Sequence, residues 1–256
     1  MFFSFSIKSF ATSAVYLLIC ATSWAGAAAD LIKNGDAFDV TLQADAALGF
    51  YLAAERLEPE NAHLLVCIAR QYRHLMADAT TREEKLRLGG IALQYAQRAA
   101  ALAPNDSEAQ LSPAIAYGKV LPFQSLKEQI EAARHIKDAA ERAIKLDPRN
   151  DLAWHVLGRW HMVLASVTGL KRTVAQLFFG ELPAASNDEA VVCFQKAIEI
   201  NPTRLMHYIE MGQTYAQMGR TADARRLITK GLAMPDVEKD DPEIKRRGRE
   251  TLAKLQ

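Results

Sequence analysis

The sequence lacks the features that mark enzymes and nucleic-acid-binding proteins. It contains no H-E-x-x-H, phosphate-loop or G-x-S-x-G motif, so the common signatures of metalloproteases, nucleotide hydrolases and serine hydrolases are missing. It also lacks an excess of charge of one sign, because 31 Lys and Arg stand against 30 Asp and Glu, whereas nucleic-acid binders normally carry a strong basic excess. We therefore expect a non-enzymatic protein that needs no cofactor or metal ion and binds no nucleic acid.

The first 29 residues contain no acidic residue and a single basic one, Lys8. An apolar stretch over 10–24 follows, and then five small residues. This order is typical of a secretory signal that is cleaved after Ala27 or Ala29. The alternative is an uncleaved membrane anchor over 10–29, since about 20 apolar residues can span a bilayer. We accordingly predict a periplasmic or secreted protein, or else one anchored by this segment.

Prolines at regular intervals close one apolar-periodic segment after another, as expected where helices must stop. Aligning these prolines divides the chain into five units with a 34-residue core, and the middle three units carry extra residues. The units are 28–61, 62–106, 107–150, 151–204 and 205–238, with a further basic helix over 239–256 that would cap the open end.

The unit at 151–204 shows the clearest pattern. It runs Trp154-x2-Leu157-Gly158-x2-His161 and then Ala190-x3-Phe194-x2-Ala197-x4-Pro202. This resembles the tetratricopeptide (TPR) repeat, in which each unit is a pair of antiparallel helices. Positions 8 and 27 of a unit, where the two helices cross, should then be small so that the helices can approach closely. All ten are Ala or Gly: Gly35, Ala69, Ala114, Gly158, Gly212 and Ala54, Ala99, Ala143, Ala197, Gly231. The sequence therefore predicts an all-α, right-handed α-solenoid of about five TPR-like helix pairs plus a capping helix.

The extra residues fall between the two helices of a unit and should mostly lengthen the second helix. Capping boxes at Ser125–Glu128 and Ser186–Glu189 mark where two second helices begin. The longest insertion, over 166–185, has the apolar spacing of a short amphipathic helix. In the third unit, Gln110 and Pro113 stand at core positions, so we expect its first helix to be short or bent.

Of the three cysteines, Cys20 lies in the N-terminal segment. The other two, Cys67 and Cys193, fall two units apart. Stacked helices are separated by about 10 Å per layer, whereas a disulfide needs Cα atoms within about 7 Å. We therefore expect two small buried apolar groups.

A more specific resemblance is carried by Leu157-Gly158-Arg159-Trp160, by the segment Leu177 to Pro183 and by Ser186-x2-Glu189-Ala190. These residues resemble the regulator of microtubule dynamics family, over roughly 40–235. The resemblance implies an all-helical adaptor, and animal members of the family are associated with microtubules or with organelle contacts. An exported protein would not meet tubulin, so the resemblance carries the fold further than the microtubule role.

The concave face of the solenoid is the predicted binding site. Positions 2, 5, 9, 12 and 13 of each first helix should face this groove, given the helical period. Cations from three neighbouring units would converge there and could hold an acidic peptide or a C-terminal carboxylate. The same charges could equally be solvated or paired within the chain. The candidate partner-binding residues are His63, Arg70, Arg73, Lys119, His155, Arg159, Met162 and Ile209.

Three functions remain open from the sequence. The first is a non-enzymatic scaffold that binds a peptide or protein segment in the groove. The second is a cytoskeleton- or organelle-associated adaptor, as the family resemblance implies. The third is an enzyme with the 166–185 insertion as a lid and His155 or His161 as the acid/base group, although no motif supplies a partner for either histidine.

Overall fold

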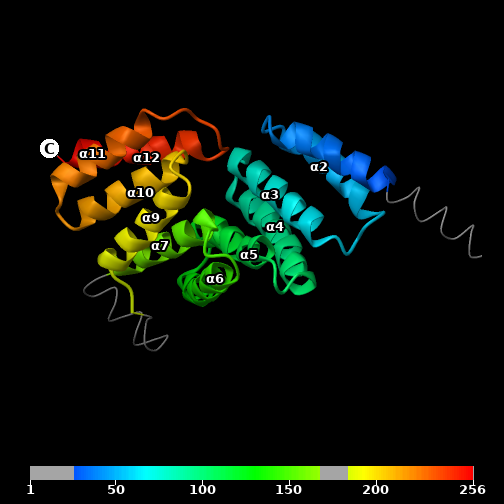
Figure 1. The fold of residues 1–256 in the computed structure, drawn as a ribbon, viewed down its shortest axis with the longest axis horizontal. Helices are drawn as coiled ribbons and strands as arrows, with labels where there is room; N and C mark the ends of the chain where they lie inside the picture. Colours follow the sequence, from blue (N-terminus) through cyan, green and yellow to red (C-terminus); the bar gives the residue numbers. More distant parts are fainter. Residues whose placement is uncertain (1–25, 168–183, 256) are drawn as a thin grey trace, which may run out of the picture.

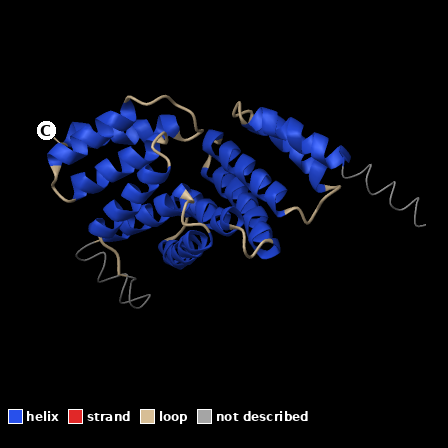
Figure 2. Cartoon of the chain, viewed as in Figure 1, coloured by secondary structure: helices blue, strands red, loops and turns tan. Residues whose placement is uncertain are grey.

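The computed structural model describes residues 26–167 and 184–255, and every regular element in those two ranges is a helix (Figure 2). A first helix covers 26–39. It is followed by α2 (Ala44–Glu55), α3 (Ala62–Asp78), α4 (Arg82–Leu102), α5 (Ser107–Val120), the 3-10 helix η1 (Leu121–Phe123), α6 (Leu126–Leu146), α7 (Asp151–Ala165), α9 (Asn187–Ile200), α10 (Leu205–Gln217), α11 (Thr221–Leu232) and α12 (Asp241–Lys254).

Consecutive helices pack as pairs, and the pairs stack into a curved array (Figure 1). The pairs are α3 with α4, α5 with α6, α7 with α9 and α10 with α11. The first helices of these pairs also touch one another in succession, α3 with α5, α5 with α7 and α7 with α10. They form one continuous inner layer. This arrangement confirms the predicted all-α solenoid of TPR-like pairs.

The glycines at the crossing positions are required by what lies opposite them. A Cβ atom on Gly35 would stand 2.5 Å from the Tyr51 ring, and one on Gly212 would stand 2.6 Å from the Ile228 side chain. In these pairs the second helix places a large residue directly over the glycine of the first helix. Close approach of the two backbones therefore depends on the absence of a side chain at this position.

The helix ends follow the predicted capping signals. The Ser125 hydroxyl accepts the Glu128 backbone N–H while the Glu128 carboxylate accepts the Ser125 backbone N–H, which completes the capping box. Ser186 accepts the backbone N–H of Glu189 at 3.1 Å. The extra residues of the second and third units lengthen α4 and α6 to 21 residues each. Of the longest insertion, residues 168–183 lie outside the described part of the chain.

The third unit differs from expectation. Helix α5 runs for 14 residues with Pro113 inside it, so it is not shortened relative to α7 or α10. The buried Gln110 has its own polar partners, because its amide donates to the carbonyls of Ala100 and Ala103 at 2.6 and 3.1 Å. These carbonyls belong to the end of α4, which lacks further helical donors. A polar residue at this core position therefore closes a helix terminus.

The last helix covers the end of the stack. Ile244 is buried, and a Cβ on Gly248 would stand 3.2 Å from the side chains of both Ile209 and Ile228. Helix α12 thus packs across the last helix pair. Cys67 and Cys193 are both buried and free, as expected. Within the described ranges, no helix combines the length and the apolar character needed to span a bilayer.

Replacing Gly212 by Ala should destabilise the protein. The new methyl group would also stand 3.1 Å from the backbone of α11, which cannot move aside as an ordinary side chain can. We expect a loss of about 1–3 kcal/mol in the free energy of unfolding from overpacking, measured by urea denaturation. Gly49→Ala is the matched control. Because nothing lies within 4 Å of that position in α2, it should gain about 0.5–1 kcal/mol. Equal effects at both positions would contradict this account of helix pairing.

Candidate functional site

The inner layer contains a pocket of about 540 Å³ between α3, α5 and the start of α7. Side chains from the three helices line it, together with residues of the loops that precede α5 and α7. Its apolar walls are formed by Val66, Leu111, Ile115 and Leu152. This volume falls within the range of sites that hold a small ligand or a few residues of a peptide.

Two of the predicted cations, Arg70 and Arg73, line this pocket. Arg70 pairs with Asp39 at 3.0 Å and donates to Sγ of Cys67 at 3.3 Å. Arg73 is only 8% exposed, and its Nη1 has no hydrogen-bond partner among the described residues. Burial, and then the charge of Arg70, lower the pKa of Arg73 to about 10. Arg73 is therefore a charged group that is poorly hydrated and lacks a direct partner.

A second polar group of the pocket, the Ser112 hydroxyl, is also buried without a hydrogen-bond partner in the described part of the chain. Ser112 on α5 is 2% exposed, and its hydroxyl has no partner among the described residues. Glu108, one turn earlier on α5, also lines the pocket and acts on the charge of Arg73. The pocket thus offers a buried cation and a hydroxyl donor beside apolar walls, and four acidic residues also line it, with Glu108 among those that act on the cation.

The other predicted cations are paired within the chain. Lys119, near the end of α5, forms an ion pair with Asp240. Arg159 on α7 lies 3.6 Å from the fully buried Glu210, which Arg247 of α12 approaches more closely at 2.8 Å. The alternative of intramolecular pairing therefore applies to Arg70, Lys119 and Arg159, but Arg73 has no ion pair among the described residues.

Three predicted groove residues lie in the core instead. His155, Met162 and Ile209 are 5%, 6% and 0% exposed, so a partner cannot reach them in this conformation. They belong to the faces that α7 and α10 turn towards neighbouring helices. His63 is exposed at the start of α3, where its Nε2 lies 3.7 Å from Sγ of Cys67.

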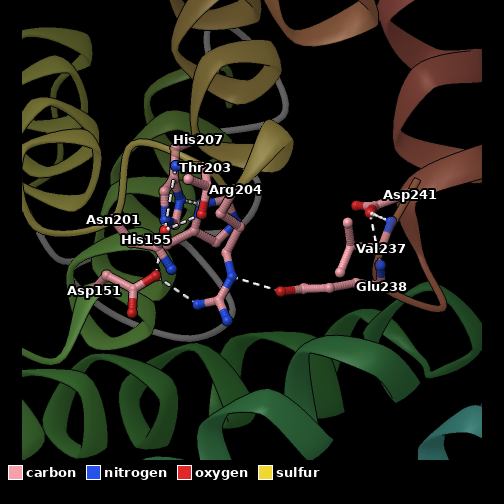
Figure 3. Close-up of polar contacts among 9 residues, drawn as sticks. All are labelled: Asp151, His155, Asn201, Thr203, Arg204, His207, Val237, Glu238 and Asp241. Atoms are coloured by element: carbon pink, nitrogen blue, oxygen red, sulfur yellow. Dashed lines mark hydrogen bonds and ion pairs between the residues drawn. The ribbon is translucent and has the colours of Figure 1, made fainter. Parts of the chain in front are cut away.

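His155 belongs to a buried polar chain that the sequence did not reveal (Figure 3). Its Nδ1 lies 3.0 Å from Nδ1 of His207, and Nε2 of His207 lies 2.9 Å from the carboxylate of Asp151. Arg204 pairs with the same carboxylate at 2.5 Å and also with Glu238 at 2.5 Å. The chain connects α7, the start of α10 and the loop before α12. Because Asp151 also lines the pocket, it links the pocket to the core.

Sequence reasoning missed this chain because its members stand at the starts of helices. Asp151 and Arg204 are the first and last residues of the unit 151–204, and they meet only when the next pair, which begins with α10, stacks on α7. Asp151 follows the N-cap of α7, where an acidic residue is ordinary. A basic residue at the N-cap of α10, where a hydroxyl or carboxylate is preferred, is the one signal that could have drawn attention to Arg204.

His161 is the second histidine that an enzyme could use as its acid/base group. His161 is half-buried, and its ring meets the indole of Trp160 edge-on with 4.9 Å between the ring centroids. Most of the proposed lid lies outside the described residues. Within them, no three His, Cys, Asp or Glu side chains gather closely enough to hold a metal ion.

Buried histidines should make the protein sensitive to mild acid. Burial and nearby arginines lower the pKa of His74 to about 4, and burial lowers the pKa of His155 and His207. Since the unfolded chain then binds more protons below pH ~6.5, this stability is complete above that pH and is lost as pH falls towards 4. Burial raises the pKa of Glu238, which acts in the opposite sense, but three groups outnumber one.

We therefore expect the urea concentration at the unfolding midpoint to decrease as the pH is lowered from 7 to 5. His74→Gln should reduce this dependence, with a limit of about 1.4 kcal/mol per pH unit for each proton involved. Denaturation curves of the wild type and the variant at several pH values would measure it. Identical slopes for the two proteins would show that His74 ionises normally in the folded state.

Comparison with known proteins agrees with this architecture. A family model described as "Regulator of microtubule dynamics protein 1-3" matches residues 28–256. Regulator of microtubule dynamics protein 1 of Mus musculus is 28% identical over 208 residues, covering 80% of this chain and 68% of the mouse protein. The Bos taurus protein 1 is 29% identical over 197 residues, covering 76% and 62%. Protein 2 of Mus musculus is 26% identical over 197 residues, covering 77% and 48%.

The chain thus spans between about half and two thirds of the length of these relatives. Among solved structures, a thermophilic TPR protein of Thermus thermophilus gives a TM-score of 0.65 at 17% identity, covering 89% of this chain and 100% of the other. A MamA structure from Desulfovibrio magneticus gives a TM-score of 0.50 at 13% identity, covering 83% and 93%. These structures support the TPR fold alone. Because the family model covers nearly all of the described residues, the chain belongs to the regulator of microtubule dynamics family.

Proposed function

We propose that this protein is a non-enzymatic scaffold that holds a segment of a protein partner against its inner layer of helices. The TPR-like fold and the family support a role in protein interaction. The single observation that carries the proposal is Arg73, a buried cation with an unsatisfied Nη1 inside a pocket of suitable size. Natural proteins leave few such groups unpaired, and each calls for an explanation.

The pocket fits a carboxylate that is followed by an apolar side chain. Arg73 would pair with the carboxylate, and the Ser112 hydroxyl would donate a further hydrogen bond. Val66, Leu111 and Ile115 offer the apolar contact. The partner group would be either an acidic side chain or the free C-terminus of a peptide.

The charge of the pocket favours a single negative charge over a double one. Four acidic residues line it, namely Asp106, Glu108, Asp147 and Asp151. Asp151 is neutralised by Arg204, but the other three form no ion pair within the described residues. They would repel a phosphate dianion more strongly than a carboxylate. A protein segment with a carboxylate is therefore the better ligand.

The location of the protein follows from the N-terminal segment. We propose export to the periplasm or the outside of the cell, with membrane anchoring over 10–29 as the alternative. The names of the relatives favour a second candidate, a microtubule- or organelle-associated adaptor. Retention of residues 1–29 in the mature protein would favour that candidate, whereas their removal would favour the exported scaffold.

Arg73→Met separates binding from folding. A buried charge that has lost its hydration is often replaced by an apolar side chain of similar size with a gain in stability. We therefore expect a rise of about 1 kcal/mol in the free energy of unfolding, together with loss of the partner. The measurements are urea denaturation and affinity capture from the native host, with the bound proteins identified by mass spectrometry.

The control is Arg87→Met on α4, where the side chain is 58% exposed and pairs with Glu84. It should retain the partner and change stability little. Arg70→Ala should weaken capture less than Arg73→Met does, because Arg70 already pairs with Asp39. A partner that is retained equally by wild type and Arg73→Met would remove the pocket from the proposal.

A further inference from the structure

The connection between α11 and α12, residues 233–240, runs back across the inner layer instead of joining the two helices directly. We call it the strap. In Figure 1 it extends from the end of α11 to a point beside the C-terminal end of α3. Its sequence, Ala-Met-Pro-Asp-Val-Glu-Lys-Asp, contains three acidic residues and one basic one. The strap therefore brings negative charge to the inner layer from the far end of the chain.

Ion pairs tie the strap to three separate helices. Asp240 pairs with Lys119 near the end of α5. Lys239 pairs with Asp78, the last residue of α3, at 2.8 Å. Glu238 pairs with Arg204 at the start of α10 at 2.5 Å (Figure 3). The strap thus crosses the inner layer as a bound peptide would.

Asp240 enters the cationic cluster that includes the pocket. Its charge acts on Arg73 and His74 as well as on Lys119. Burial raises the pKa of Asp240, but Lys119 outweighs this effect, so the pKa is lowered. The Asp240 carboxylate thus pairs directly with Lys119 and acts through space on Arg73, the cation that would hold an acidic partner.

Besides these ion pairs, the middle of the strap is held by its backbone, because the N–H groups of Val237 and Glu238 donate to the buried Asp241 carboxylate at 2.8 and 2.7 Å. The side chain of Val237, its central apolar residue, is 67% exposed and anchors nothing. The paired side chains at Lys119, Asp240 and Glu238 are each about one-third exposed, and ion pairs of this kind are individually weak and screened by salt. The side chains of Glu238 and Asp240 can therefore leave the inner layer without breaking a hydrophobic contact, whereas Met234 stays packed against the last helix pair.

Both ends of the strap would stay in place when these side chains leave. Lys245 pairs with Asp236 at 2.5 Å and also donates to the carbonyl of Met234. At the other end, Asp240 is the N-cap residue of α12, and its backbone carbonyl accepts the N–H of Ile244 at 2.9 Å. Helix α12 itself is fixed by the burial of Ile244. The capping of the solenoid is thus independent of the three ion pairs.

We propose that the carboxylates of Glu238 and Asp240 act as an internal acidic ligand of the inner layer, which an acidic partner segment must displace in order to bind. This inference rests on the proposed scaffold function and adds its regulation. A partner would carry carboxylates at the spacing of the strap and would replace them at Lys119 and Arg204. Tethered to the same chain, the strap competes at an effective concentration in the millimolar range, so it selects against weakly acidic segments.

The test uses the strap as its own probe. A fluorescent peptide with the sequence of residues 233–242 is titrated into the chain from Asp30 onward, in the wild type and in Glu238→Gln/Asp240→Asn. The variant frees Lys119 and Arg204, so we expect it to bind the peptide about tenfold or more tightly than the wild type does. Adding Lys119→Glu to the variant should abolish that gain. A peptide with its acidic residues replaced by amides should bind neither protein.

Hydrogen exchange supplies a second measurement that needs no ligand. The amides of 236–240 should exchange faster in Glu238→Gln/Asp240→Asn than in the wild type, whereas those of α12 should not change. In the wild type, raising the salt concentration should have the same effect as the substitutions. Equal peptide affinity of wild type and variant, or unchanged exchange in the strap, would overturn the proposal and leave the strap a structural tie.

The two proposals fail in different ways. The peptide titration depends on Lys119 and Arg204, and it needs no natural partner. Capture of the partner depends on Arg73. Loss of the strap effect with Arg73-dependent capture intact would overturn only the regulation. A strap effect without Arg73-dependent capture would overturn only the scaffold function of the pocket.

Discussion

The helix pairs of this protein depend on the close approach of two helices at a glycine, and the stacking of the pairs depends on that contact in turn. The ring of Phe194 lies over Gly158, where a Cβ atom would stand 3.0 Å from it. Tyr51 over Gly35 and Ile228 over Gly212 repeat the contact in other pairs. Each pair is therefore a thin, rigid unit, and stacking such units places the first helices side by side. The cations of α3 and α5 share one surface only because of this stacking.

The repeat could be predicted from the sequence because its determinants are local. A proline follows the second helix of each unit, and a small residue stands where the two helices of a unit cross. Both recur at fixed positions and can be recognised without knowledge of the neighbouring unit. The same period placed Arg70 and Arg73 correctly on the inner layer. The period wrongly placed His155 and Ile209 in the groove. It predicts the side of the helix on which a residue lies, but not which helix packs against that side. His155 meets His207 of the next pair, and Ile209 meets Gly248 of α12.

The strap contacts could not have been predicted for a different reason. Lys119 and Asp240 are separated by 121 positions in the chain, and their meeting depends on the curvature accumulated over several pairs. Small rotations between units add along the stack, so an error of a few degrees per unit would move the strap away from α5. Charge pattern alone indicated acidic partners for the inner layer. It did not indicate that the chain supplies one of them itself.

Arg204 connects the two ends of this arrangement. It holds Glu238 of the strap and Asp151 of the pocket wall with one guanidinium group (Figure 3). Burial alone would raise the pKa of Asp151, but His207 and Arg204 outweigh it and lower the pKa. Loss of the strap leaves Arg204 with a single carboxylate partner and strengthens its hold on Asp151, because the two acids no longer share its charge. Release of the strap would thus reduce the negative charge felt in the pocket, which favours entry of a carboxylate beside Arg73. Occupation of the strap's site on the inner layer and occupation of the pocket would then be coupled through Arg204.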